Sequence, residues 1–193
     1  GMGKKISVMS EGVWEVPTGK LKVNSVLAGL ILAGSPLFSA DVEAHLAEHS
    51  LEVQLPFIHE LNGNASIVPV TVMSATAKEC AEAGRALARA LRSYGKEVLI
   101  VVSSDMNHYE SDEETRVKDR AAIEAVLKLD SGGLLSVTSA KDISMCGVLP
   151  AAIAIEAAKA LGAKEARLVK YATSGETSGD MDHVVGYAGI IIK

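Results

Sequence analysis

The chain has 193 residues, 48% of them hydrophobic and 4% aromatic, and its formal net charge is −5 at pH 7. The length suffices for one full domain, the hydrophobic content excludes a disordered chain, and the acidic balance excludes the basic footprint of a nucleic-acid-binding protein. No hydrophobic run approaches the ~20 residues that span a bilayer, and the N-terminal stretch lacks a signal-peptide pattern. Because the two cysteines also indicate no disulfide framework, we expect a cytoplasmic protein without a membrane partner.

In the first half of the chain, hydrophobic spacing and turn residues predict short strands and three helices. The expected strands are 5–9, 13–16 and 66–72, and the expected helices are 21–33, 52–60 and 75–94. Ser50 is interpreted as the N-cap of the second helix, which Pro56 is expected to kink, and Gly95 is expected to end the third. Cys80 lies on the hydrophobic stripe of that third helix and is interpreted as a core residue.

The most informative stretch begins with five hydrophobic residues, Val98 to Val102, four of which are β-branched. Such a run is typical of a strand buried on both faces of a parallel sheet, and with 66–72 it predicts a right-handed β-α-β unit. Polar residues follow at once: Ser103, Ser104, Asp105, Asn107 and His108. Ligands bind beyond the carboxyl ends of strands in such sheets, so this cluster is either a site or a polar strand-to-loop exit in which Asp105 caps the next element.

The second half of the chain continues the alternation of helices and strands. Helices are expected at 112–129, 131–140 and 149–161, strands at 166–172 and 184–192, and a loop at 173–182. The last strand is strongly hydrophobic and is expected at or near the centre of its sheet. The whole pattern predicts an α/β fold, a three-layer α/β/α sandwich with a mostly parallel or mixed central sheet.

Two further features are open to a functional or a structural interpretation. Cys146 directly precedes a predicted helix, where the helix dipole lowers the pKa of a thiol, but a buried free cysteine explains it as well. His45 and His49 are four residues apart, which suits metal chelation on a helix, although two solvent-facing histidines are the more common case. Neither feature decides a function by itself.

Four motifs that occur in order along the chain indicate a particular family more specifically than either of these single features does. They are EHSLEVQLPF (48–57), VVSSDMNHY (101–109), MCGVLP (145–150) and YATSGETSGDMDHVVGYAG (171–189), and with the opening SVMSEGVWEVP (7–17) they resemble the MEMO family across the whole chain. The resemblance implies a LigB-like fold, related to the extradiol dioxygenases that use non-haem Fe(II). It also implies that family members carry roughly 70–90 further residues upstream, within ordinary domain size, so we expect residues 1–193 to form a single MEMO-like domain lacking its N-terminal part.

The resemblance also assigns roles to particular residues. His108 matches the acid/base histidine of the dioxygenases, Cys146 matches the position of their carboxylate metal ligand, and Asp105 accompanies them as a catalytic residue. Glu48, His49 and Ser104 are expected to line the substrate pocket. A thiolate ligand favours iron, copper or zinc over hard ions, so Fe(II) or Cu is the expected cofactor and ring opening is not implied. Because two histidines of the family site lie in upstream motifs, the family metal site is expected to be incomplete here.

Three functions remain open on the sequence alone. The first is a MEMO-family protein that binds a redox-active metal near His108 and Cys146. The second is a non-catalytic module that uses a vestigial dioxygenase cleft to bind a peptide or a protein, with a radical-SAM protein as one partner that the resemblance suggests. The third is a thiol enzyme with Cys146 as the nucleophile and His108 as its base. A sheet that lacks a strand exposes backbone and hydrophobic surface, so we also expect a homo-oligomer.

Overall fold

The computed structural model describes residues 3–193, which form two compact units, one ending at Ser103 and the other beginning at Ser104. We call them the N-terminal and C-terminal units. The strands are β1 (Ile6–Val8), β2 (Val13–Val16), β3 (Gly19–Val23), β4 (Phe38–Ala40), β5 (Ser66–Ile67), β6 (Val70–Val72), β7 (His108–Glu110), β8 (Ala166–Thr173) and β9 (Val184–Ile192). The helices are α1 (Ser25–Gly34), α2 (Leu55–Leu61), α3 (Ala77–Tyr94), α4 (Asp112–Leu127), α5 (Ser131–Ala140), α6 (Val148–Leu161) and the short α7 (Gly175–Ser178), with 3₁₀ turns at Glu43–His45 and Glu52–Gln54.

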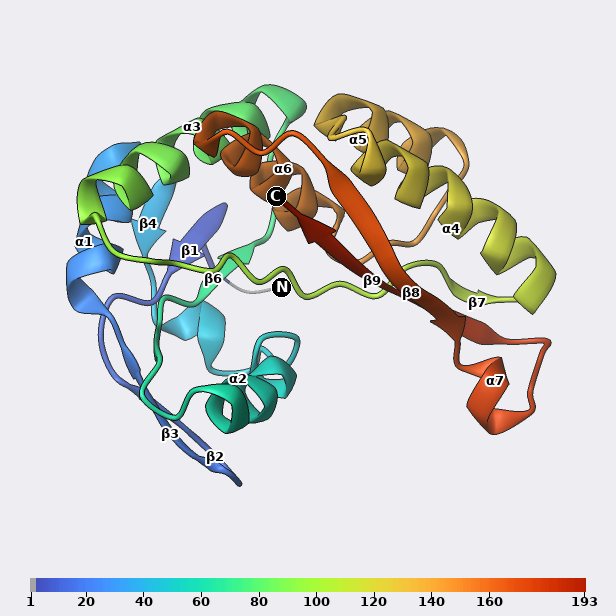
Figure 1. Cartoon of the computed structure of the whole chain (residues 1–193), viewed down its shortest axis with the longest axis horizontal. Coiled ribbons are helices and arrows are strands. Elements are labelled where there is room, and N and C mark those ends of the chain that lie inside the picture. Colours follow the sequence, from blue (N-terminus) through green and yellow to red (C-terminus); the bar gives the residue numbers. More distant parts are fainter. Residues whose placement is uncertain (1–2) are drawn as a thin grey trace. The chain divides into compact units, whose positions relative to one another are not determined.

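The N-terminal unit contains two small mixed sheets (Figure 1). In the first, β1 lies between β4, to which it is parallel, and β6, to which it is antiparallel. All three residues of β1 are buried, and α1 packs against both β4 and α3. In the second sheet, β3 pairs with β2 as a hairpin and runs parallel to β5, and α2 covers β3. Val16, Leu21 and Leu55 form the centre of that smaller core.

The C-terminal unit is an antiparallel sheet with one helical face (Figure 1). As predicted, β9 is the central strand, and it pairs with β7 and β8. Helix α4 packs on β8 and β9, and α5 packs between α4 and α6. Met106, Ile123, Leu134 and Ile155 belong to the buried core of this unit. The α/β class with mixed sheets is therefore confirmed.

Four predictions for the N-terminal unit were wrong. The helix expected from residue 21 begins only at Ser25, because residues 19–23 pair as β3 and the side chain of Asn24 caps the helix through the Leu27 N–H. Ser50 is not a helix N-cap, and Pro56 does not kink a helix but lies in the first turn of α2, where its missing N–H costs no intrahelical bond. The run 66–72 is divided into β5 and β6, which belong to different sheets.

The strand expected at Val98–Val102 is also absent. The segment connects α3 to β7 as an unpaired trace (Figure 1), and none of its backbone groups forms a hydrogen bond with the rest of residues 3–193. Four of its five side chains are 38–83% exposed. Since a strand exists only through its pairing with a neighbour, strand-forming composition alone was not sufficient, and the predicted β-α-β unit does not form.

The remaining predictions for the second half were largely correct. The helices 112–129, 131–140 and 149–161 and the strand 166–172 are present within two residues of their predicted ends. The loop predicted at 173–182 contains the one-turn helix α7. None of the helices that the structure describes combines the length and the hydrophobicity needed to cross a bilayer.

Candidate metal site

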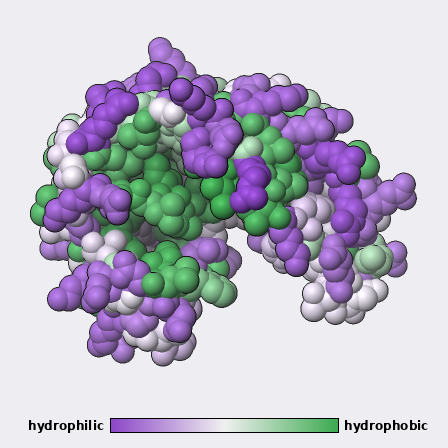
Figure 2. Space-filling model, viewed as in Figure 1, coloured by the Kyte–Doolittle hydropathy of each residue, from purple (hydrophilic) through white to green (hydrophobic). Residues whose placement is uncertain are grey.

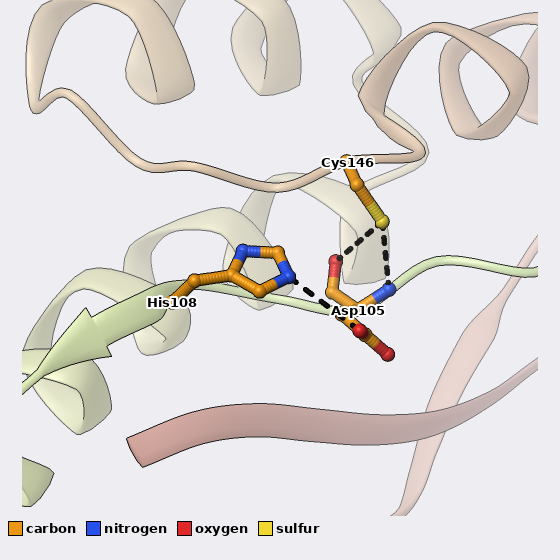
Figure 3. A group of neighbouring side chains, drawn as sticks. All are labelled: Asp105, His108 and Cys146. Atoms are coloured by element: carbon orange, nitrogen blue, oxygen red, sulfur yellow. Dashed lines mark hydrogen bonds and ion pairs between the residues drawn. The ribbon is translucent and has the colours of Figure 1, made fainter. Parts of the chain in front are cut away.

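Three side chains of the C-terminal unit converge on one point (Figure 3). Asp105 lies in the segment that leads into β7, His108 is the first residue of β7, and Cys146 lies in the turn before α6. One carboxylate oxygen, one ring nitrogen and the sulfur all lie within 4.8 Å of one another. The sequence brought these residues together only through the family resemblance, whereas the fold does so by the hydrogen bonds that hold the turn around Cys146 against the start of β7.

The three residues also contact one another. His108 Nε2 lies 3.5 Å from Asp105 Oδ2, and the Asp105 N–H donates to Cys146 Sγ over 3.2 Å. The Asp105 side chain is 46% exposed, the His108 side chain is 16% exposed, and Cys146 is exposed. The group is therefore open to solvent on one side.

Ser104 connects the two segments that carry the site. Its Oγ accepts from the Gly147 N–H over 2.9 Å, donates to the Asp105 carbonyl over 2.7 Å and lies 3.9 Å from Cys146 Sγ. These bonds occupy the hydroxyl in holding the turn that carries Cys146. Its predicted role in binding substrate stays a prediction.

Glu48 and His49 lie in the N-terminal unit. The Glu48 carboxylate accepts hydrogen bonds from the N–H groups of Ser50 and Leu51, so it caps its own turn, and His49 is exposed. Their predicted place in the substrate pocket stays a prediction. His45 is buried, and its Nε2 has no hydrogen-bond partner among the described residues, so the solvent-facing interpretation holds for His49 and was wrong for His45.

A second layer of residues lies behind the site, and sequence reasoning named one of them, Asn107, only as part of the polar cluster and missed Asp119 and Tyr171. Asn107 is buried, and its N–H donates to Asp119 Oδ1 over 2.8 Å, while the Tyr171 hydroxyl donates to Asp119 Oδ2 over 2.7 Å. Burial raises the pKa of the Asp119 carboxyl, and burial together with that carboxylate raises the pKa of Tyr171. The sequence contained one signal for Asp119. It is an acidic residue on the core-facing stripe of the helix predicted at 112–129, between Thr115 and Ala122.

The donor set has a definite chemical preference. A thiolate and an imidazole are ligands for iron, copper and zinc, and a single carboxylate is compatible with all three. Three protein ligands leave further coordination positions open, which is the arrangement of catalytic sites and not of closed structural ones. The residues present therefore fit a transition-metal ion.

Comparison with known proteins decides the family. The family model described as Memo-like protein matches residues 1–191. The chain belongs to the Memo-like family. It is 44% identical over 191 residues to a MEMO1 family protein of Pyrobaculum aerophilum, a match that covers 99% of this chain and 68% of the relative. A MEMO1 family protein of Desulfurococcus amylolyticus is 46% identical, with 98% and 67% covered, and one of Thermotoga neapolitana is 39% identical, with 100% and 68% covered.

The comparison confirms the resemblance inferred from the four motifs. It also places all three donor residues of this Memo-like chain inside the matched region. What these proteins bind or catalyse does not follow from their names.

Proposed function

We propose that this Memo-like protein binds a redox-active transition-metal ion, Fe(II) or Cu, through Cys146, His108 and Asp105. The observation that supports the proposal is the convergence of a sulfur, a nitrogen and an oxygen donor within 4.8 Å, on one exposed side of the C-terminal unit. A bound ion of this kind supplies open coordination positions for a substrate or for dioxygen. The chain's own contribution is to hold the three donors, with the Asp105 N–H directed at the sulfur.

The same contacts favour a metal site over a thiol enzyme. In a nucleophile–base pair the imidazole nitrogen forms a hydrogen bond with the nucleophile. Here His108 Nε2 faces the Asp105 carboxylate, and Cys146 Sγ receives its hydrogen bond from a backbone N–H (Figure 3). His108 and Cys146 are thus arranged around a shared space and not as a bonded pair.

The test is the affinity of the protein for Fe(II), Cu(I) and Zn(II), measured anaerobically by competition with chromophoric chelators. Cys146→Ser should weaken binding by more than the roughly 10–100-fold that loss of an outer-layer partner costs, and His108→Ala should also weaken it, by a smaller factor. Cys80→Ala is the matched control, because Cys80 is the other cysteine and is buried in α3. Equal affinity of Cys146→Ser and the wild type would rule out this site.

We propose as a second candidate function that Val98–Val102 binds an added β-strand from a second copy of the chain. The segment has five hydrophobic residues and no backbone hydrogen bonds to any other described residue, and Leu99 is 83% exposed. Figure 2 shows hydrophobic residues gathered on the face of the N-terminal unit where this segment runs in Figure 1. A segment with unpaired backbone N–H and C=O groups and hydrophobic side chains can pair with an added strand.

The segment is complementary to itself. Antiparallel pairing about a two-fold axis at Ile100 places hydrophobic residues opposite hydrophobic ones throughout, and it places Glu97 opposite Ser103 without opposing like charges. A second copy therefore provides partners for the backbone N–H and C=O groups and also covers the hydrophobic side chains.

Sedimentation analysis across a range of protein concentrations tests the pairing. The wild type should dimerise, and Leu99→Lys should shift the equilibrium to the monomer. Val117→Lys is the control, because Val117 is 64% exposed on α4, outside the segment. A wild-type monomer at every concentration, or equal effects of the two lysines, would exclude the second copy as the occupant.

A further inference from the structure

The contacts of His108 determine which of its ring nitrogens carries the proton. Nδ1 lies 2.7 Å from the carbonyl oxygen of Ser144, and a carbonyl can only accept a hydrogen bond. On the other side of the ring, Nε2 lies 3.5 Å from Asp105 Oδ2, too far for a good hydrogen bond. The shorter contact therefore places a proton on Nδ1, so that in the neutral ring Nε2 carries the lone pair, on the side of the ring that faces Asp105 (Figure 3).

Ser144, the residue that carries this carbonyl, is itself held by a buried side chain. Asn107 Oδ1 accepts from the Ser144 N–H over 3.1 Å and from the Ser144 hydroxyl over 3.2 Å. The His108 N–H in turn donates to Ser144 Oγ over 2.8 Å. Ser144 is thus tied to two successive residues of the segment that enters β7.

Asn107 is fixed from the opposite side by the core. It is 1% exposed, and its N–H donates to Asp119 on α4, which also accepts from the Tyr171 hydroxyl on β8. Its Nδ2 donates to Glu110 over 2.5 Å and lies 3.4 Å from Thr115 Oγ1. Since the amide nitrogen is engaged by these acceptors, the amide oxygen must face Ser144.

We infer that Asn107 is a positioning residue for the metal site, acting through the Ser144 carbonyl to hold His108 in the tautomer whose Nε2 is free to bind an ion. The inference rests on the proposed metal-binding function. It extends the site from three ligands to a chain of hydrogen bonds that runs from His108 through Ser144 to the buried residues Asn107 and Asp119. Partners of this kind fix the tautomer and the ring orientation of histidine ligands.

The tautomer is measured directly by long-range ¹H–¹⁵N NMR of the metal-free protein, at a pH well above the ordinary histidine pKa of about 6.5. In the wild type, His108 should carry its proton on Nδ1. In Asn107→Ala the Nε2-protonated form should appear, and Zn(II) affinity, measured with the metal alone, should fall about 10–100-fold. Asn62→Ala is the matched control, because it removes an asparagine side chain of the N-terminal unit, whose Oδ1 accepts from the Asn64 N–H, and leaves Asn107 and Ser144 intact, and it should retain the wild-type tautomer.

Two results would overturn the inference: an Nε2-protonated His108 in the wild type, or an Asn107→Ala protein with unchanged tautomer, whatever its affinity. The wild-type spectrum needs no variant, so the test holds even if Asn107→Ala fails to fold. If Asn107→Ala changes the tautomer of His108 but the wild type binds no Zn(II), the positioning role of Asn107 is supported. That result overturns only the proposed metal site. The two failures are therefore distinguishable.

Discussion

At the scale of single residues, Gly186 on β9 determines how closely the site segment approaches the sheet. Its N–H donates to the Asn107 carbonyl over 3.0 Å, and its carbonyl accepts from the Met106 N–H over 2.9 Å. A Cβ at this position would lie 1.8 Å from Asp119 Oδ2 and 3.2 Å from Met106 Cβ. The missing side chain therefore makes room for the carboxylate that anchors Asn107.

We predict that Gly186→Ala destabilises the protein by about 1–3 kcal/mol, the usual cost of forcing an extra carbon into a packed interior. Gly189→Ala is the matched control on the same strand, because its Cβ would meet nothing nearer than the Lys170 carbonyl at 3.9 Å. That control should be neutral or slightly stabilising, since alanine restricts the unfolded chain. Urea denaturation measures both, and equal midpoints for the two variants would contradict the close approach.

The residues of the site differ in how far the sequence reveals them. Asp105 and His108 stand in the motif VVSSDMNHY and Cys146 stands in MCGVLP, so the family resemblance identified all three without a fold. Asn107 and Asp119 act through burial and through bonds to residues far along the chain, which local pattern does not encode. His45 was misjudged for the same reason, because a histidine in a polar stretch gives no local sign that it is buried.

At the scale of elements, α3 was predicted almost to its ends because its local signals agree. Gly95 ends it in the left-handed region, with φ of 67°. At its start, Thr76 Oγ1 accepts from the Glu79 N–H over 3.2 Å, and the Glu79 carboxylate accepts from the Thr76 N–H over 2.7 Å, which completes a capping box. Lys5 also pairs with Glu79, over 2.8 Å, so the cap connects α3 to the segment before β1.

We predict that Thr76→Ala lowers the free energy of unfolding by about 1 kcal/mol, since it leaves a helix N–H without its acceptor. Thr76→Ser keeps the hydroxyl and should retain most of that stability. Chemical denaturation followed by circular dichroism compares the two variants. A serine variant as unstable as the alanine variant would show that the methyl group of Thr76, and not the cap, is responsible.

The segment 98–102 shows where element prediction fails. Its composition favours a strand as strongly as that of β9 does, but β9 lies between β7 and β8, whereas no described strand adjoins 98–102. The composition of a segment indicates how well its side chains fit a pleated sheet. Whether the segment forms a strand also depends on a neighbouring strand with which its backbone can pair. The α/β class was predictable because it depends on the alternation of elements, and the division of the strands among three sheets was not.

At the scale of the whole molecule, the ionised carboxylates determine how stability depends on pH. The hydrogen bond from Lys5, together with hydrogen bonding by Thr76, lowers the pKa of Glu79 to about 2. Arg116 lowers the pKa of Asp112, and Lys118 lowers the pKa of Glu110. For each of these groups the unfolded chain binds a proton more readily than the folded chain. Their contribution to stability is therefore complete above their ordinary pKa values and is lost as the pH falls through the folded ones.

We predict that the midpoint of thermal unfolding falls steadily as the pH is lowered from about 4.5 toward 2, the interval between the unfolded and folded pKa values of Glu79. Asp119 opposes the trend, because burial raises the pKa of its carboxyl and protonation then favours the folded state. Because Asp119 is one group and Glu79, Asp112 and Glu110 are three, we expect the protein as a whole to lose stability in acid. Glu79→Gln should be less stable than the wild type near neutral pH and should show a flatter profile below pH 4.5. If the unfolding midpoints of the two proteins fell in parallel with pH, Glu79 would not contribute to acid destabilisation. The ion pairs of Asp112 with Arg116 and of Glu110 with Lys118 would then be its cause.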